Sequence, residues 1–181
     1  MTLSLCVREP LRDADDGRQY RFGVAVTTRL PGVGAICPFV SEHGAVAVQS
    51  HASDWLGERT LAYLADGLAV DDAVAALLAA DDNRRNRQVH GVDADGSVAV
   101  TGSGCVEFAG HHEAGQFTVA GNLLAGEDVL AATARSYETT AFGDPPLAER
   151  LIDALAAGVD AGGDRRESLT VGSAAVRVVS T

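Results

Sequence analysis

The order of hydrophobic periodicities is the feature that most constrains the fold of this chain. Segments with the two-residue period of strands alternate in blocks with segments of helical period. Strands are predicted at residues 2–8, 20–28, 44–50, 88–92, 97–101, 117–120 and 171–179. Helices are predicted at residues 54–67, 71–78, 127–134 and 147–157. Antiparallel strands with segregated helix pairs predict an α+β layered domain, and a sheet sandwich with a helix layer on each side fits this order.

The connections support one domain over residues 1–181. Residues 9–19 are polar and contain Pro10 and Gly17, so they predict a hairpin turn between the first two strands. No linker, repeat or low-complexity block divides the chain. With 46% apolar residues, a chain of this length can bury a sizeable core.

The charge composition limits the classes of partner. The net charge is −11, and all 14 basic residues are Arg. Such a surface repels nucleic-acid phosphates and anionic membranes, so neither is an expected partner. Adaptation to high salt and a GC-rich genome both explain the bias, and we favour the halophilic explanation. No apolar run approaches the roughly 20 residues of a membrane span, and no secretory signal is recognisable, so a cytoplasmic location is expected.

Cofactor and metal motifs are not recognisable in the sequence. The cysteines Cys6, Cys37 and Cys105 are widely spaced, which predicts buried reduced thiols. His111 and His112 are consecutive, so their side chains diverge and do not predict a metal site. The chain also lacks the glycine motifs of nucleotide binding. We therefore expect no cofactor and no metal.

Thr2 is the candidate nucleophile. If Met1 is removed, one residue carries both a hydroxyl and a free α-amine that can serve as its base. In the strand, Thr2, Ser4 and Cys6 share one face, and the opposite face is apolar, so one face can pack on a core while the other lines a polar cleft. The simpler interpretation is an ordinary first strand that begins Met-Thr.

Three glycine-containing segments supply further candidates. Gly104 follows a strand, where a free amide can bind an oxyanion, although a tight turn or β-bulge is the simpler explanation. Asn122 joins a strand to a helix and can orient a substrate, or simply cap the helix. Asp164 and Arg165 follow Gly162-Gly163; Arg165, held by Asp164, can bind a substrate carboxylate, or both can belong to a solvated charge cluster.

Together these segments resemble a known family. They are residues 2–4, 22–26, 44–50, 87–89, 92–96, 101–105, 109–111, 121–126 and 162–166. In this order the chain is similar to the domain of unknown function family 1028, placed among the N-terminal nucleophile (Ntn) hydrolases. The resemblance implies a four-layer αββα sandwich with Thr2 as the nucleophile. Relatives usually continue beyond the position of Thr181, and many Ntn enzymes place a Lys near the nucleophile, which this chain lacks.

The leading hypothesis is an N-terminal-threonine amidohydrolase that acts on a small amide through an acyl-threonine intermediate. Gly104 or Asn122 would hold the oxyanion, and Arg165 would receive a substrate carboxylate. The alternative is a non-catalytic binding or scaffold protein that retains the fold. A weaker third hypothesis gives Cys6 a redox or ligand-binding role. A homodimer or higher homo-oligomer is expected, because Ntn-type sheets and helix layers often assemble.

Overall fold

The computed structural model describes residues 1–11, 19–166 and 172–180. Within them the chain is α+β, with two antiparallel sheets and four α-helices. The five-stranded sheet contains, in spatial order, β7 (Gly110–Glu113), β8 (Phe117–Asn122), β1 (Thr2–Pro10), β2 (Tyr20–Thr28) and β9 (Ser173–Ser180). The four-stranded sheet contains β3 (Pro38–Ser41), β4 (Gly44–Ser50), β5 (Arg87–Asp93) and β6 (Ser97–Thr101).

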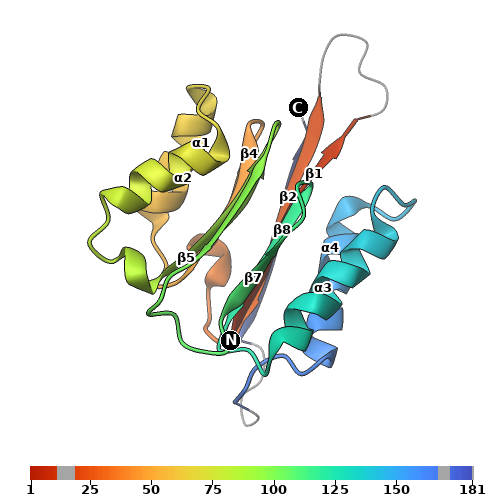
Figure 1. The fold of residues 1–181 in the computed structure, drawn as a ribbon. Helices are drawn as coiled ribbons and strands as arrows, with labels where there is room; N and C mark the ends of the chain where they lie inside the picture. Colours follow the sequence, from red (N-terminus) through yellow and green to blue (C-terminus); the bar gives the residue numbers. More distant parts are fainter. Residues whose placement is uncertain (12–18, 167–171, 181) are drawn as a thin grey trace.

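The helices cover the outer faces of the two sheets. Figure 1 shows α1 (Asp54–Ala65) and α2 (Val70–Ala79) beside the four-stranded sheet, and α3 (Glu127–Thr140) and α4 (Leu147–Asp160) beside the five-stranded sheet. The sheets face each other, with β1 opposite β4 and β8 opposite β5. Separate hydrophobic clusters fill the space under each helix pair and between the sheets. Within the described part of the chain, none of the helices is long and apolar enough to cross a membrane.

Strand β1 shows how the sequence pattern becomes layered packing. Leu3 and Leu5 belong to the cluster beneath α3 and α4. Ser4 and Cys6 point the other way and hydrogen-bond to residues of the four-stranded sheet. Because successive side chains of a strand alternate between faces, one strand contributes to two layers. The predicted division of β1 into a polar and an apolar face is confirmed.

Two short edge strands, β3 and β7, were not predicted from the sequence. β7 reads Gly-His-His-Glu and is largely exposed, so it has no apolar alternation to reveal it. Only its pairing with β8 makes it a strand.

α3 also continues to Thr140, beyond the predicted end at residue 134. β1 and β2 pair antiparallel from Thr2↔Thr28 to Pro10↔Tyr20, as a hairpin requires. Residues 12–18 of the predicted turn and Val171 of the predicted last strand lie outside the described residues.

Candidate functional site

The amino-terminal end of β1 lies in a row of polar side chains. Thr2 pairs with Asn122 of β8 on one side and with Thr28 of β2 on the other. Directly paired residues of an antiparallel sheet project to the same face, so all three side chains face the second sheet. Thr28 and Asn122 are buried, and Thr2 is half-buried. The Oγ1 atoms of Thr2 and Thr28 are 3.2 Å apart.

A small cavity adjoins Thr2 between the two sheets. Its volume is about 50 Å³, and Thr2, Thr28 and Gln49 are among its lining residues. Its lining is mainly apolar, with a few polar side chains, and a space of this size can hold a water molecule that those side chains bind. The Thr2 side chain therefore adjoins both a neighbouring hydroxyl and a space large enough for water.

The amine, the carbonyl and the side chain of Met1 all have partners in the structure. Its amine donates a hydrogen bond to Asp164 Oδ2 at 2.5 Å. Its carbonyl oxygen accepts from Thr28 Oγ1 at 2.9 Å and from the Arg29 backbone N–H at 3.4 Å. Its side chain is 2% exposed and belongs to the cluster beneath α3 and α4. Because the Thr28 hydroxyl proton goes to Met1, Thr2 is the donor in the Thr2–Thr28 pair.

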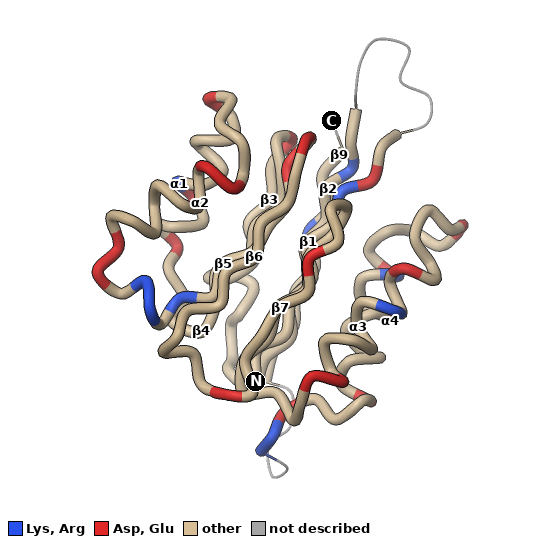
Figure 2. Tube along the Cα trace, viewed as in Figure 1, with Lys and Arg blue, Asp and Glu red and all other residues tan. Residues whose placement is uncertain are grey.

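Asp164 brings three cationic groups together. Arg166 donates to its carboxylate through Nε at 3.0 Å and Nη2 at 2.9 Å, beside the bond from the Met1 amine. Arg29 Nε forms an ion pair with Asp164 Oδ2 at 3.3 Å without hydrogen-bond geometry, and this buried nitrogen has no hydrogen-bond partner among the described residues. Figure 2 shows a basic segment close to the marked N-terminus. The cluster therefore has more positive than negative charge.

These contacts shift the pKa values of both ionised partners. Burial favours a raised pKa for Asp164, but hydrogen bonds from Arg166 and the terminal amine outweigh it and hold the pKa well below its usual value. Burial lowers the pKa of the Met1 amine below 8.0, Asp164 opposes this shift, and the charges of Arg166 and Arg29 add to it. The carboxylate is thus firmly ionised, while the amine loses its proton more readily than usual.

A buried hydrogen-bond network joins Asn122 to the four-stranded sheet. Gln88 Nε2 donates to the carbonyls of Gly110 and Gly121, at 3.0 and 2.9 Å. These acceptors fix the orientation of the Gln88 amide, so its Oε1 is the acceptor. That oxygen accepts from Asn122 Nδ2 at 3.2 Å and from Gln49 Nε2 at 2.8 Å. Gln88 therefore positions the amide of Asn122 beside Thr2.

The same network determines the tautomer of His90. Gln49 Oε1 accepts from Ser4 Oγ at 2.7 Å, so the Ser4 proton is already used. His90 Nε2, 2.6 Å from Ser4 Oγ, must then donate, and Nδ1 accepts from Thr118 Oγ1 at 2.8 Å. Burial lowers the pKa of His90 to about 3. Ser4 and His90 are consequently a neutral structural pair, in which the histidine does not act as the serine's base.

The structure brings some of the predicted site residues together. Thr2, Asn122 and Asp164 meet around the first residues of β1. Gly104 donates its N–H to the Arg85 carbonyl at 2.6 Å, so this amide is already engaged. Arg165 is exposed, and its Nη1 donates to the Glu107 carbonyl at 2.6 Å. The expected Asp164–Arg165 pairing is wrong, because the Asp164 carboxylate accepts hydrogen bonds from the side chain of Arg166.

Three contributors to this cluster were missed: Thr28, Arg29 and Arg166. The first two could have been found from the hairpin, because a turn centred near residue 15 places Thr28 opposite Thr2. Arg166 stands next to the predicted arginine, and residue types alone do not distinguish the two. Asp164 reaches Met1 because it bridges to Leu124, just after β8.

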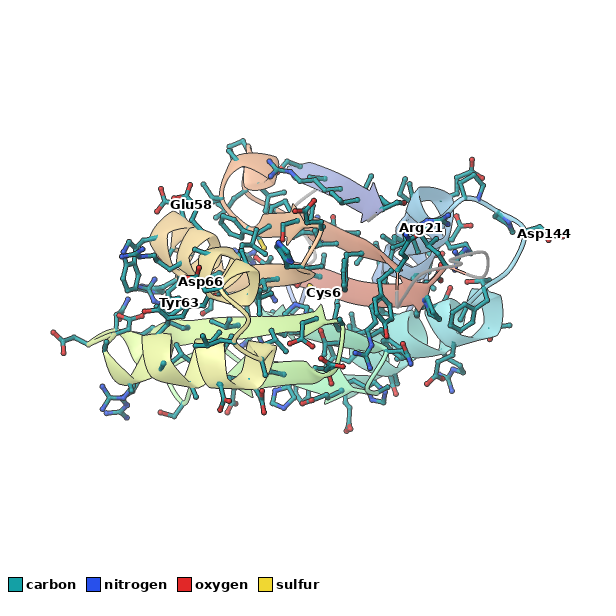
Figure 3. All side chains as sticks on the ribbon, turned by 90° about the horizontal axis from the view of Figure 1, so that it is seen from above. Cys6, Arg21, Glu58, Tyr63, Asp66 and Asp144 are labelled. Atoms are coloured by element: carbon teal, nitrogen blue, oxygen red, sulfur yellow. The ribbon has the colours of Figure 1, made fainter. Side chains whose placement is uncertain are left out.

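The described residues include no group of three His, Cys, Asp or Glu side chains that could hold a metal ion. Cys6 lies in the interior between the layers, as Figure 3 shows, and is fully buried. Burial raises the pKa of its thiol well above the usual value, and raises that of Cys37 to about 12. A thiolate is therefore disfavoured at both positions, and the Cys6 hypothesis gains no support.

Comparisons with known proteins place the chain in a family. The profile of the family of unknown function DUF1028 matches residues 10–181. The chain belongs to the DUF1028 family. A solved DUF1028 structure, protein SPO2555 from Silicibacter pomeroyi, matches with a TM-score of 0.82 and 29% sequence identity. The match covers 98% of this DUF1028 chain and 73% of that one. A comparison with curated proteins found no match.

Proposed function

We propose that this DUF1028 chain, once Met1 is removed, is an N-terminal-threonine amidohydrolase acting on a small amide. The observation that carries the proposal is the position of Thr2. It begins the central strand of its sheet, lines a cavity between the sheets, and follows a residue whose amine lies in the Asp164 cluster. A hydroxyl and a terminal amine on that residue would share one enclosed polar site.

The arrangement of layers supports an Ntn-type assignment. Helices, sheet, sheet and helices follow one another across the molecule (Figure 1). This is the order of the αββα sandwich, in which the nucleophile would begin a strand at the interface between the sheets. The inter-sheet orientation of Thr2, Ser4 and Cys6 agrees with that placement.

The reaction would proceed through an ester on Thr2. Its hydroxyl oxygen attacks the amide carbonyl carbon, and the α-amine of Thr2 takes the hydroxyl proton. The C–N bond then breaks, and the amine returns that proton to the leaving nitrogen. Water next attacks the ester carbonyl, releasing the carboxylic acid and restoring the Thr2 hydroxyl. The sum of the steps is amide plus water giving acid plus amine.

The local electrostatics suit a terminal amine that acts as a base. An α-amine has an ordinary pKa of about 8, so it is mainly protonated at neutral pH. In the chain that bears Met1, burial and two guanidinium groups already lower the pKa of the amine. Similar surroundings one residue along would increase the neutral fraction of the Thr2 amine. Asn122, positioned by Gln88, would orient the substrate or the amine.

Met1 would have to be removed before the chain folds. In the folded chain its side chain is buried and its amine is held by Asp164. An aminopeptidase needs a free amine and an accessible first peptide bond. A folded chain that retains Met1 would therefore stay unprocessed, with a peptide nitrogen on Thr2 that cannot act as a base.

The test uses chain purified with Thr2 as its first residue, as verified by intact mass. This protein is incubated with a panel of small amides, and the acyl adduct on Thr2 and the released amine are measured. The Thr2→Ala variant with the same terminus should fold normally and lose turnover by at least ~10⁴-fold. Equal activity of the variant, or absence of adduct and turnover over the whole panel, refutes the enzyme proposal.

The tight binding of Met1 specifically favours the alternative, a non-catalytic binding or scaffold protein. Its amine, carbonyl and side chain all have partners, so the chain that retains Met1 is well accommodated. Intact-mass measurement of protein from its natural host separates the two proposals. A mass that includes Met1 supports the scaffold, and a mass lower by one Met residue supports the hydrolase.

A further inference from the structure

The methionyl group of Met1 is an acyl group on the nitrogen of Thr2, and it can be compared with the acyl group that a reaction would place on the Thr2 hydroxyl. In the chain, the methionyl carbonyl is bonded to the nitrogen of Thr2. In an acyl-threonine intermediate, the substrate carbonyl is bonded to Oγ1 of the same residue. The two arrangements are isomers that differ by an N-to-O shift within one residue. The Met1 side chain lies on the helix side of β1 and the Thr2 hydroxyl on the side of the second sheet, at the free end of the strand. The surroundings of Met1 are a guide to the groups that an acyl group on Thr2 could reach around that end.

The first part of this space is an ammonium subsite. The Met1 amine lies 2.5 Å from Asp164 Oδ2, and both groups are fully buried. Arg166 keeps Asp164 ionised by donating two hydrogen bonds to it. Removing Met1 leaves Asp164 paired with Arg166 but takes one hydrogen-bond donor away from its Oδ2 atom, which then offers an acceptor site beside Thr2. A substrate with an ammonium group next to its carbonyl carbon could donate to that oxygen in place of the Met1 amine.

The second part is a carbonyl subsite. Thr28 Oγ1 and the Arg29 N–H both donate to the Met1 carbonyl oxygen. Without Met1, the two donors converge on a position beside the Thr2 hydroxyl. A substrate carbonyl could accept both bonds there, and the bonds would strengthen as the oxygen gains negative charge during attack.

The third part is an apolar subsite. The Met1 side chain is 2% exposed and is buried in a cluster that includes Leu124 and Val129. Removing this side chain leaves an apolar space beneath α3 and α4. Filling such a space with a side chain of similar volume is favourable, and a glycine would leave it empty.

From these three subsites, and resting on the proposed amidohydrolase function, we propose that the substrate is an amide of an α-amino acid. It carries a free α-ammonium, bound by Asp164, and an unbranched or modestly branched apolar side chain. Water and the amino-acid amide give the free amino acid and an amine. Asp164 thereby recognises substrate directly, in place of the substrate carboxylate expected at Arg165.

Binding tests the inference without catalysis. The Thr2→Ala chain lacking Met1 is titrated with L-methioninamide, N-acetyl-L-methioninamide and glycinamide, and binding is followed by calorimetry. L-methioninamide should bind at least ~10-fold more tightly than either analogue, since each analogue lacks one required group. The matched control is the Thr2→Ala chain that retains Met1, whose own residue fills the site and should block binding. Equal affinity for the acetylated amide overturns the inference.

Turnover separates this inference from the function on which it rests. With unsubstituted chain lacking Met1, kcat/KM for L-methioninamide should exceed that for the acetylated amide at least ~10-fold, and Asp164→Asn should reduce this ratio. Hydrolysis of both amides at one rate overturns the substrate class and leaves the hydrolase intact. Binding of L-methioninamide without hydrolysis of any amide refutes the hydrolase and leaves the ammonium subsite supported.

Discussion

The two ends of β1 lie in two different clusters of buried charge. At its far end, Glu9 accepts from Arg150 Nη1 and Nη2 at 2.5 and 2.7 Å, and from the Tyr137 hydroxyl at 3.0 Å. One carboxylate meets one guanidinium, and both are buried. At the amino-terminal end, one carboxylate meets an ammonium and two guanidinium groups, and Arg29 Nε has no hydrogen-bond partner among the described residues.

The difference separates a structural ion pair from a candidate site. The Glu9–Arg150 pair is balanced and hydrogen-bonded, and Arg150 ties α4 to β1. Burial favours a raised pKa for Glu9, but the bonds from Arg150 and Tyr137 outweigh it and lower the pKa. The Asp164 cluster is unbalanced and depends on the chain's own terminus. It is this unbalanced cluster, which includes the Met1 amine, that we propose as a binding site.

The largest expected effect is a loss of folding stability in acid. Its measurement shows whether either ion cluster causes that loss. His90 is neutral when folded, with a pKa lowered to about 3 by burial, whereas it titrates near 6.5 when unfolded. The unfolded chain binds the proton first, so stability is full above pH 6.5 and falls as the pH drops toward 3. The loss should be on the order of 5 kcal/mol.

Denaturant unfolding at a series of pH values measures this, with His90→Gln as the control. The carboxylates contribute below their ordinary pKa values of 4.5 and 3.8, so the slope between pH 4.5 and 6.5 reports on His90. An unchanged slope in the variant would assign acid sensitivity to the ion clusters instead.

The second effect is the loss of the balanced pair. Glu9→Gln leaves the buried Arg150 guanidinium without its anion, which should lower the free energy of unfolding by about 3–5 kcal/mol. Adding Arg150→Met removes the unpaired charge and should recover part of the loss. Equilibrium urea unfolding of the single and double variants gives both values. A double variant less stable than Glu9→Gln would contradict the interpretation.

The third effect is the loss of the carboxylate at the amino-terminal end of β1, the counterpart of Glu9→Gln. Asp164→Asn should lower the free energy of unfolding of the chain that retains Met1 by only about 1–2 kcal/mol. Arg166 is 41% exposed and can return to water, and the Met1 amine can lose its proton. The same urea experiment compares it with Glu9→Gln. Equal losses at the two ends would remove the distinction between them.

The smallest effect is the titration of the Met1 amine. Burial lowers its pKa below 8.0, so the unfolded chain holds this proton more strongly than the folded chain. Stability should therefore rise slightly as the pH increases toward 8. An NMR titration of chain labelled with ¹⁵N-methionine reads the amine directly. A pKa at or above 8.0 would show that the attraction of Asp164 outweighs burial and the two guanidinium groups.

Much of the fold could be predicted from local pattern. The period of residues 2–8 identified β1 and its two faces, and the order of strands and helix pairs identified an α+β domain. The strands β3 and β7 could not be predicted, because they are short edges defined by their neighbours. Of the candidate site, Thr2, Asn122 and Asp164 were predicted by residue type and motif, and they lie close together in the structure. Thr28 and Arg29 carry no signal in their own segment, and only the register of the β1–β2 hairpin could have located them.

The sequence by itself determined the alternation that turns Thr2 and Ser4 toward one sheet and Leu3 toward the helices, because side-chain direction in a strand depends only on position. Tertiary structure alone decided that Asp164, 163 residues away, receives the Met1 amine and that Arg166 rather than Arg165 accompanies it. These contacts depend on the bridge between Asp164 and Leu124, just after β8, which brings Asp164 to the start of β1. The hydrophobic periodicity of either segment does not predict that bridge.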